Sequence, residues 1–286
     1  MEKVSKQVEE RFGNLPGLVI EPARGWTSLG LREVWQYREL FYFLAWRDTK
    51  VRYRQTVLGA SWALLQPLLL MGLFTVIFGL LLRVDSGGAP YPIFAFSALL
   101  PWQLFAFALI TASNSLVNDR NLVTKVYFPR IIVPFASVAV GLADFGISLL
   151  MLIGMLLIYR TPITARVLAL PAFALLALLS ALAVGIWLSA LIVKYRDFRY
   201  IIPFLTVFWM YATPIAYPVS LIPEGWQALY ALNPMVGVVE GFRWALLGES
   251  GLRPVSLLIS TAVVILLFVS GLVYFRRSED SFADVI

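Results

Sequence analysis

The chain has 286 residues, of which 60% are hydrophobic and only 14% are charged. Soluble domains average about 45–50% apolar and about 25% charged residues, so this composition excludes an ordinary soluble domain, which could not bury so much apolar surface. The net charge is +6, and the sequence has no Cys and no His, which excludes disulfide frameworks, thiol nucleophiles, imidazole bases and the usual zinc sites. The composition predicts an all-α integral membrane protein.

The chain before the first long apolar run divides into two parts. Residues 1–30 predict an irregular cytoplasmic tail. Residues 31–55 repeat apolar side chains at helical spacing between charged ones, which is typical of an amphipathic helix lying in the membrane interface. Such a helix would anchor the first span, or it would flank a cytoplasmic substrate entrance where clustered cations attract the phosphates of head groups. These cations are Arg47, Lys50, Arg52 and Arg54.

Six apolar runs follow, within residues 56–275. A bilayer core of about 30 Å needs about 20 apolar residues in a helix. Five runs meet that length with at most one charge each, namely 57–82, 91–117, 131–159, 167–193 and 254–275. The remaining run, 200–217, is interrupted by Pro203 and Pro214, so we predict a short or broken fifth span and six spans in all.

The positive charge is distributed unevenly between the two sides of these spans. Eighteen of the 23 Lys and Arg residues lie in four segments, 1–56, 118–130, 194–199 and 276–286. Cytoplasmic loops carry the excess of Lys and Arg, so both termini, including the tail 276–286, are predicted to be cytoplasmic. The net charge therefore reports topology, and no nucleic-acid partner is expected.

The loop 118–130 combines charges with apolar side chains on what should be an aqueous face. These apolar residues are Leu122, Val123, Val126, Tyr127 and Phe128. Exposed apolar groups of this kind predict a docking site for a cytoplasmic partner, and the alternative is a surface helix half-sunk in the membrane interface. The connection 194–199 is similar but shorter, and there the simpler explanation is charge that sets topology.

Asp144 lies near the middle of the third predicted span. A charged side chain at that depth is costly, so we expect it to face the bundle interior or a cavity. It would line a pore or a subunit contact, or it would accept a hydrogen bond from a neighbouring helix, for example from Gln103. Both interpretations remain open.

Aromatic residues make up 14% of the chain, more than two interfacial belts require. Several lie inside the second and fifth spans, where the default role is packing or lipid contact. Lining a wide conduit for carbohydrate is the alternative, because aromatic faces stack on sugar rings. The candidates are Trp102, Phe105, Phe208, Trp209 and Tyr211, with Asp144 beside them.

Residues 213–253 are too long for a simple turn and too charged for another span. Two short re-entrant helices on the external side fit this pattern best. Irregular backbone at membrane depth is tolerated only where protein or a water-filled path covers it. We therefore predict an external gate here, with Tyr217, Glu240 and Arg243 as its candidate residues.

The sequence contains no GxxxxGK[ST] phosphate loop, and it shows no acid pair, Ser–base set or metal-ligand cluster on a plausible aqueous face. No catalytic residue, metal or bound cofactor is predicted. The expected protein is a conduit driven by energy released elsewhere.

Three separated segments resemble one known family. They are 46–69 (WRDTKVRYRQTVLGASWALLQPLL), 118–134 (NDRNLVTKVYFPRIIVP) and 232–248 (LNPMVGVVEGFRWALLG). Together they resemble the permease subunit of type-2 ABC exporters for polysaccharides, a family that exports lipid-linked O-antigen, capsular polysaccharide and teichoic acid. The resemblance covers the chain from about residue 25 to residue 275.

The resemblance implies a homodimer of permeases in the bacterial inner membrane, bound to two copies of a separate ATPase subunit that holds ATP and Mg²⁺. It implies that 31–55 lies beside the entrance of the lipid-linked substrate, whose pyrophosphate would meet the four cations. It implies that 118–130 is a coupling helix received by the ATPase, and that 218–248 forms two re-entrant helices. The coupling residues expected on this basis are Asn118, Asn121, Leu122, Lys125, Phe128, Pro129, Arg130, Arg196 and Asp197.

The expected function is ATP-driven export of an undecaprenyl-linked polysaccharide, with O-antigen favoured over capsular polysaccharide and teichoic acid. An ABC exporter of small drugs or lipids is the alternative within transport. A membrane-embedded sugar or acyl transferase would need acids or His clustered on one aqueous side, which the sequence lacks. A purely structural scaffold is disfavoured by the cost of Asp144.

Overall fold

The computed structural model describes residues 35–54, 59–248, 253–279 and Phe282. Every regular element in these ranges is a helix, which confirms the predicted all-α class. The predicted tail 1–30, the first residues 31–34 of the predicted interface helix and the terminal residues 283–286 lie outside the described part of the chain.

Five helices in the described ranges are long and apolar enough to cross a bilayer. They are α4 (Gly59–Phe74) with its π-helical continuation η1 (Thr75–Leu81), α5 (Tyr91–Asn118), α7 (Ile132–Ile158), α8 (Leu170–Lys194) with the preceding 3-10 turn η2 (Ala165–Ala169), and α12 (Pro254–Glu279). They coincide with the five uninterrupted apolar runs. The interrupted run forms α9 (Phe198–Tyr211), whose 14 residues extend for about 21 Å, less than the bilayer core of about 30 Å. The count of six spans therefore stays a prediction.

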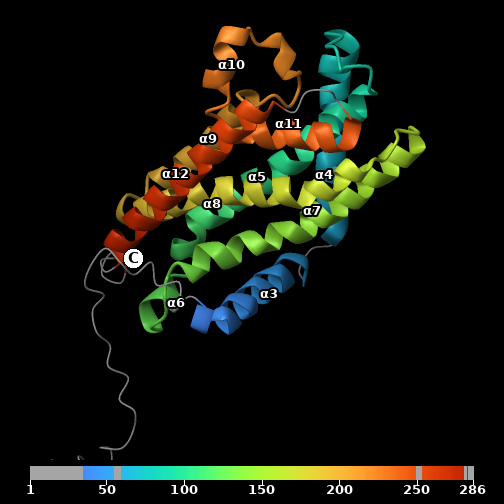
Figure 1. The fold of residues 1–286 in the computed structure, drawn as a ribbon. Helices are drawn as coiled ribbons and strands as arrows, with labels where there is room; N and C mark the ends of the chain where they lie inside the picture. The colour runs from blue at the N-terminus through green and yellow to red at the C-terminus, as the bar shows by residue number, and fades with distance from the viewer. Residues whose placement is uncertain (1–34, 55–58, 249–252, 280–281, 283–286) are drawn as a thin grey trace, which may run out of the picture.

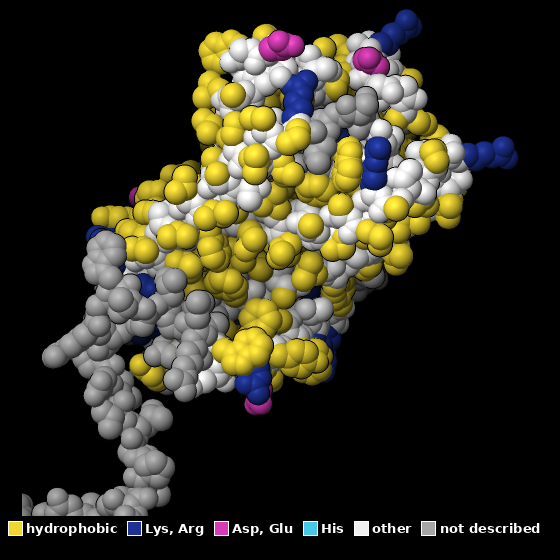
Figure 2. All heavy atoms as spheres, viewed as in Figure 1, with side chains coloured by type: hydrophobic (Ala, Val, Ile, Leu, Met, Phe, Trp, Pro, Cys, Tyr) yellow, Lys and Arg dark blue, Asp and Glu magenta, His cyan; other side chains and the backbone are white. Residues whose placement is uncertain are grey.

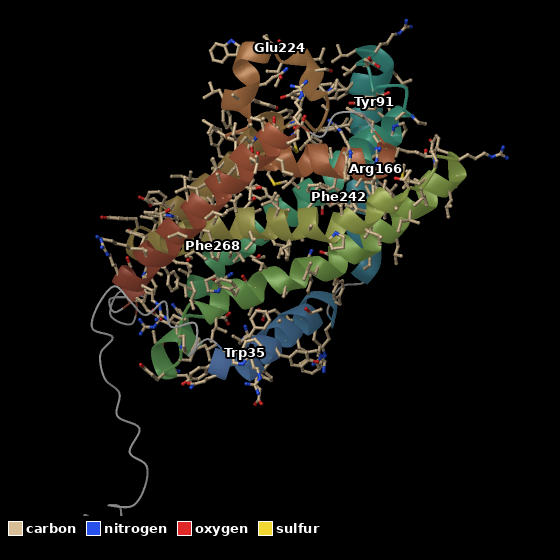
Figure 3. All side chains as sticks on the ribbon, in the orientation of Figure 1. Trp35, Tyr91, Arg166, Glu224, Phe242 and Phe268 are labelled. Carbon is tan, nitrogen blue, oxygen red and sulfur yellow. The ribbon has the colours of Figure 1, made fainter. Side chains whose placement is uncertain are left out.

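The remaining helices flank the bundle or lie toward its ends. They are α3 (Arg38–Arg54), α6 (Arg120–Lys125), η3 (Val219–Leu221), α10 (Glu224–Tyr230) and α11 (Pro234–Leu247). Helix α3 lies beside α7. In Figure 1, α6 and the C-terminal end of α12 lie at one end and α10 lies at the other. Trp35 and Glu224, labelled in Figure 3, mark these two ends. The described residues of the predicted region 213–253 thus contain two α-helices, α10 and α11, and the short 3-10 turn η3, and insertion of these helices into the outer leaflet stays a prediction.

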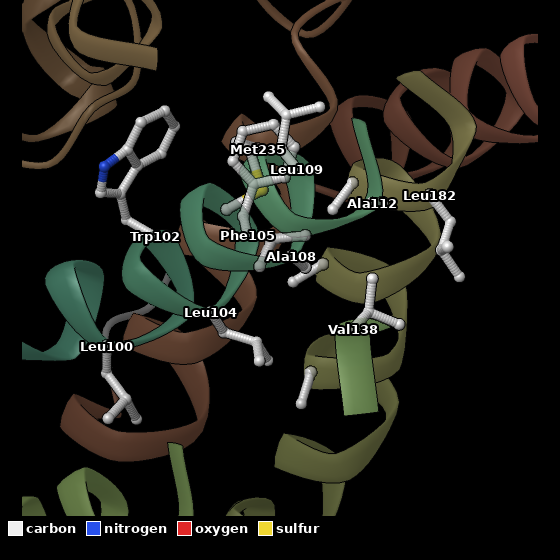
Figure 4. Close-up of a cluster of buried hydrophobic side chains, with 14 of the residues drawn as sticks. Leu100, Trp102, Leu104, Phe105, Ala108, Leu109, Ala112, Val138, Leu182 and Met235 are labelled. Carbon is white, nitrogen blue, oxygen red and sulfur yellow. The ribbon is translucent and has the colours of Figure 1, made fainter. Parts of the chain in front are cut away.

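Helix α5 forms the centre of the bundle, in contact with α4, α7, α8, α9 and α11. Figure 4 shows its side chains beside Val138 of α7, Leu182 of α8 and Met235 of α11. The hydroxyls of Ser97 and Ser113 donate to carbonyl oxygens three and four residues earlier, at 2.8 and 2.6 Å. These bonds allow polar residues to be buried without an unpaired donor.

The exposed surface agrees with a bilayer environment. Figure 2 shows a broad apolar face over the middle of the molecule, with charged side chains mainly toward its ends. Leu69, Leu150 and Leu266 are exposed members of the spanning helices. Large exposed apolar areas are rare on soluble monomers, and lipid is the environment that tolerates them.

Helices α5 and α8 approach each other closely at Gly185. A Cβ atom at Gly185 would lie 2.8 Å from the Cβ of Ala112, so Gly185→Ala should force the helices apart and lower the free energy of unfolding by about 1–3 kcal/mol. Thermal unfolding in detergent measures this change. Gly154→Ala is the matched control, because nothing lies within 4 Å of its added Cβ. Equal effects of the two substitutions would contradict the close-packing role of Gly185.

Candidate functional site

Asp144, on α7, is paired with two consecutive residues of α3. Arg52 Nη2 donates to Asp144 Oδ2 at 2.6 Å, and the Tyr53 hydroxyl donates to Asp144 Oδ1. A carboxylate in an apolar span is costly unless it is paired and hydrogen-bonded, and these contacts meet that requirement. Asp144 does bond to a neighbouring helix, as one interpretation expected, but in this structure its partners are Arg52 and Tyr53 and not Gln103.

The physical reason for this difference is the position of α3, which packs along α7 (Figure 1). Helical periodicity identifies α3 as a helix but does not indicate which helix it contacts. Burial, together with the bond to Asp144, raises the pKa of Tyr53 to about 12. The Tyr53 hydroxyl therefore stays protonated at neutral pH and acts as a donor.

Arg52 and Asp144 border a cavity of about 330 Å³ between α4, α5 and α7. Its polar lining residues are Arg52, Gln66, Gln103, Asp144 and Ser148, and its aromatic ones are Trp102, Phe107 and Phe145. The Arg52 guanidinium lies 4.4 Å from the ring centroid of Phe107, which is a cation–π contact. Gln103 Nε2 is buried, and no described residue accepts a hydrogen bond from it.

Arg47, a second predicted head-group cation, is paired elsewhere. Its Nη2 donates to both carboxylate oxygens of Asp119 at 2.8 and 3.0 Å, and its Nε donates to Asp48 at 2.7 Å. Burial raises the pKa of Asp119 and outweighs the opposing effect of Arg47. Arg47 therefore joins α3 to the end of α5, and two carboxylates neutralise its charge.

Lys50 and Arg54, the other two predicted cations, are exposed and have no carboxylate partner in the described part of the chain. They line an open groove of about 340 Å³ together with Trp46, Thr49 and Tyr53. Lys50 Nζ lies 4.5 Å from the centroid of the Trp46 ring. The four cations therefore lie in three places: Lys50 and Arg54 at this groove, Arg52 at the cavity and Arg47 at Asp119. Tyr53 lines the groove and also donates to Asp144.

The predicted coupling loop contains α6 and an extended segment that leads to α7. Asn121 and Lys125 are exposed, and Leu122 is half-buried. Phe128, predicted as a docking residue, is only 4% exposed, so it packs inside the molecule and offers no contact surface. Val126 and Tyr127 are the exposed apolar residues of this segment, with Tyr127 70% exposed. Sequence reasoning placed both on the apolar face of the loop but selected Leu122 and Phe128 as coupling residues, because spacing alone does not show which side chains the fold buries.

The end of α12 holds the start of α7. The Arg130 backbone N–H donates to Glu279 Oε1 at 2.9 Å, and the Arg130 guanidinium donates to the Glu279 carbonyl oxygen. Arg276 Nη1 donates to Glu279 Oε2 at 3.1 Å. No sequence signal indicated a role for Glu279, since it lies about 150 positions from its partner.

The two predicted inside loops also meet at this end. Arg199 Nη2 donates to Asn118 Oδ1 at 3.5 Å, joining the first turn of α9 to the end of α5. Arg196 and Asp197 are exposed in the connection between α8 and α9, whereas Pro129 is buried beside Arg130. All the predicted coupling residues thus belong to the α6 end, although not all are accessible.

At the opposite end, side chains from two other elements hold the irregular segment 212–218 that follows α9. Arg243 donates to the carbonyl oxygens of Ile215 and Tyr217 at 2.8 and 3.1 Å. Arg243 is 3% exposed, and its guanidinium lies 3.6 Å from the centroid of the Phe94 ring. Irregular backbone in an apolar environment needs such donors, so Arg243 supports this segment.

Sequence reasoning missed two further residues that hold this segment. The Tyr91 hydroxyl donates to the Ala216 carbonyl oxygen at 2.8 Å, and Asn233 Nδ2 donates to the Ala212 carbonyl oxygen at 3.0 Å. Asn233 Oδ1 also accepts from the Met235 N–H, which makes Asn233 the N-cap of α11. Asn directly before Pro at a helix start is a signal that could have identified it.

The predicted gate residues are brought together in part. Arg243 bonds to the backbone of Tyr217, and the Tyr217 hydroxyl lies 2.9 Å from the Tyr230 hydroxyl. Glu240 is partly buried on α11, one turn before Arg243.

The predicted conduit aromatics fall into two groups. Trp102, Phe105 and Trp209 pack in series, with ring centroids 5.2 and 4.9 Å apart, and Phe105 is fully buried. Phe208 and Tyr211 are exposed on α9. The structure therefore does not place the five rings around one opening of a single chain.

Residues 39–247 match the family described as ABC-2 type transporter. The match begins in α3, runs through every element of the sites above except the end of α12, and covers well over half of the chain. The chain belongs to the ABC-2 type transporter family.

Several curated relatives are similar to this ABC-2 family member over most of their length. It is 33% identical to "O-antigen export system permease protein RfbA" of Myxococcus xanthus, over 90% of this chain and 98% of that protein. It is 27% identical to a protein of the same name from Klebsiella pneumoniae, over 87% of this chain and 95% of that protein. It is 25% identical to "Polysialic acid transport protein KpsM" of Escherichia coli, over 82% of this chain and 92% of that protein.

Membership of the ABC-2 family makes this chain a multi-pass transport component. The residues that pair α3 with α7, and those that hold the segment 212–218, lie inside the matched range. Glu279 lies beyond the matched range. The contact of Glu279 with the α6–α7 connection therefore comes from the structure and is not part of the family match.

Proposed function

We propose that this chain is the permease of an ATP-driven exporter that moves an undecaprenyl-linked polysaccharide, of the O-antigen class, across a bacterial inner membrane. One observation carries the proposal: 33% identity to an O-antigen export permease over 90% of this chain and nearly all of the relative. Sequence similarity over nearly the full length of both chains is stronger support for a shared substrate class than similarity of fold alone would be. The substrate would move from the inner to the outer face.

A separate ATPase, in two copies on a homodimer of this permease, would supply the energy and bind ATP and Mg²⁺. This sequence has no phosphate-loop motif of its own. The exposed Val126 and Tyr127 beside α6 would be its docking surface, because apolar groups at the edge of a membrane domain suit a protein contact. Four segments that hold 18 of 23 basic residues support placing α6 and both termini in the cytoplasm.

The pyrophosphate of the lipid carrier would first meet α3. Lys50 and Arg54 face an open groove, and cations at the leaflet surface attract anionic head groups by about 1 kcal/mol each. Arg52 lies next along the helix, at the cavity. The exposed Phe208 and Tyr211 of α9 would face the conduit in the dimer, and the segment 212–218 would form its external gate.

Capsular polysaccharide is the second candidate substrate. The 25% identity to a polysialic acid transport protein favours it, although that identity is lower and covers less of this chain than the O-antigen relative does. Teichoic acid and small lipids have no comparable observation in their favour.

Export by proteoliposomes that contain the permease, its genetically adjacent ATPase and a lipid-linked O-polysaccharide tests the proposal. ATP should make the polymer accessible to a glycosidase on the far side. Lys50→Glu with Arg54→Glu should reduce that export by at least about tenfold, because attraction for the head group becomes repulsion, while the ATPase still copurifies. No ATP-dependent polymer movement by the unmodified complex would overturn the proposed function.

Arg83→Glu with Arg160→Glu is the matched control, since it makes the same change in net charge at the other end of the spans. It should leave export near the unmodified level. Equal losses from both pairs would remove the head-group role of Lys50 and Arg54.

A further inference from the structure

The cavity at the α3–α7 contact contains one cation and one anion that neutralise each other. Arg52 and Asp144 are joined at 2.6 Å, yet their side chains remain 40% and 21% exposed. Arg52 has five N–H donors, and its hydrogen bond to Asp144 uses one nitrogen. The guanidinium is therefore occupied but still accessible to a second anion from the cavity.

Gln103 supplies the second observation. Its Nε2 is buried at the same cavity and has no acceptor among the described residues. A buried donor without an acceptor is costly, and few are retained in folded proteins, so this one calls for a physical explanation. An acceptor that reaches Gln103 only in another state of the cavity would provide it, and Asp144 is the anionic side chain that lines this cavity.

We infer that Asp144 competes with the substrate's diphosphate for Arg52, and that Gln103 receives Asp144 when the diphosphate wins. In the state described here Asp144 accepts from Arg52 and Tyr53. On arrival of a diphosphate, Arg52 exchanges the carboxylate for a phosphate oxygen, and Asp144 accepts from Gln103 Nε2. The inference deepens the proposed function and rests on it for the identity of the anion.

The competition confers selectivity between lipids. A diphosphate carries about two to three negative charges and a phospholipid such as phosphatidylglycerol carries one, so only the diphosphate out-competes a carboxylate on the same guanidinium. Bilayer phospholipids greatly outnumber the substrate. Asp144 therefore keeps abundant monoanionic lipids off Arg52. It creates specificity by weakening the binding of these lipids more than that of the diphosphate.

Titration calorimetry on the full chain in nanodiscs tests this selectivity. The probes are geranylgeranyl pyrophosphate and inorganic pyrophosphate, in zwitterionic nanodiscs with and without phosphatidylglycerol. In the unmodified chain phosphatidylglycerol should leave the Kd unchanged. Asp144→Asn should tighten the Kd about fivefold and make it sensitive to phosphatidylglycerol. An Asp144→Asn variant with unchanged or weaker affinity and no such sensitivity would overturn the inference.

Gln103→Met provides the test of the second partner. It should weaken binding about threefold in the unmodified chain and have no effect in the Asp144→Asn background, because Gln103 acts only through the Asp144 carboxylate. Equal effects in both backgrounds would overturn its role. If Asp144→Asn does not fold, Gln103→Met alone decides: weakening supports the exchange and unchanged affinity rejects it.

The control for charge is Asp85→Asn, which makes the same change in net charge in the exposed turn after η1. It should leave both Kd values unchanged. Tightening with both probes means that the site reads the diphosphate itself, and tightening with the lipid alone means that it reads the head group in the bilayer. The assay needs neither ATPase nor polymer, so a failed export experiment with a positive result here would reject only the polysaccharide substrate.

Discussion

Arg243→Met should lower the free energy of unfolding by about 2–4 kcal/mol and abolish transport. The substitution fills similar volume but leaves the carbonyl oxygens of Ile215 and Tyr217 without their donor in a buried, apolar region. It also removes the cation–π contact with Phe94. Thermal and denaturant unfolding of the purified protein in detergent measures the loss.

A graded series separates the bonds from the charge. Arg243→Lys keeps the charge but cannot span two carbonyls with a planar fork, so it should fall between Met and the unmodified residue. Tyr91→Phe removes one hydroxyl bond to the same segment and should cost about 1 kcal/mol. Arg253→Met, at the same end but more exposed, is the control. If it costs as much as Arg243→Met, support of the segment 212–218 is not the cause.

Val126→Asp with Tyr127→Asp should reduce export at least about 100-fold and prevent copurification of the ATPase, while the permease remains folded. Both side chains are exposed, so the carboxylates add little strain to the fold but place two desolvated charges in the proposed apolar interface. Affinity capture of the complex and the export assay measure the two effects. Undiminished copurification and export would reject this surface as the docking site.

Two controls make this test specific. Val126→Thr with Tyr127→Phe keeps the size of the two side chains and should retain most of the coupling. Phe128→Asp should instead destabilise the permease itself, because that side chain is buried and the substitution would bury a charged carboxylate at an apolar position. Loss of the ATPase with a stable permease is expected only for the exposed pair.

Sequence patterns predict the long helices of this protein well, because burial in lipid requires an uninterrupted apolar run. The prolines of the fifth run correctly indicated a short helix, since α9 has 14 residues, but whether it crosses the bilayer stays a prediction. The cost of an intramembrane carboxylate correctly indicated that Asp144 would be paired and would border a cavity. These conclusions follow from local composition and from the free-energy cost of leaving a polar group unpaired in lipid.

Contacts between helices distant in sequence were not predictable on the same basis. Periodicity placed Arg52 in a surface helix and Asp144 in the bundle, and nothing in either pattern joins them. Phe128 and Tyr127 are adjacent and both aromatic, yet one is buried and one exposed. That choice depends on how the chain turns between α6 and α7, which a single sequence does not reveal.

The hydrogen bonds from Arg130 to Glu279 join the C-terminal end of α12 to the segment that leads into α7, so we expect the two to move together. Phe282, just beyond, is buried against Phe275 with ring centroids 5.2 Å apart, so the joined region extends past the end of α12. Affinity tags and fluorescent proteins are customarily fused to the carboxyl terminus of permeases. A probe attached close to Phe282 should therefore respond to movement of the α6–α7 connection, which is proposed to contact the ATPase.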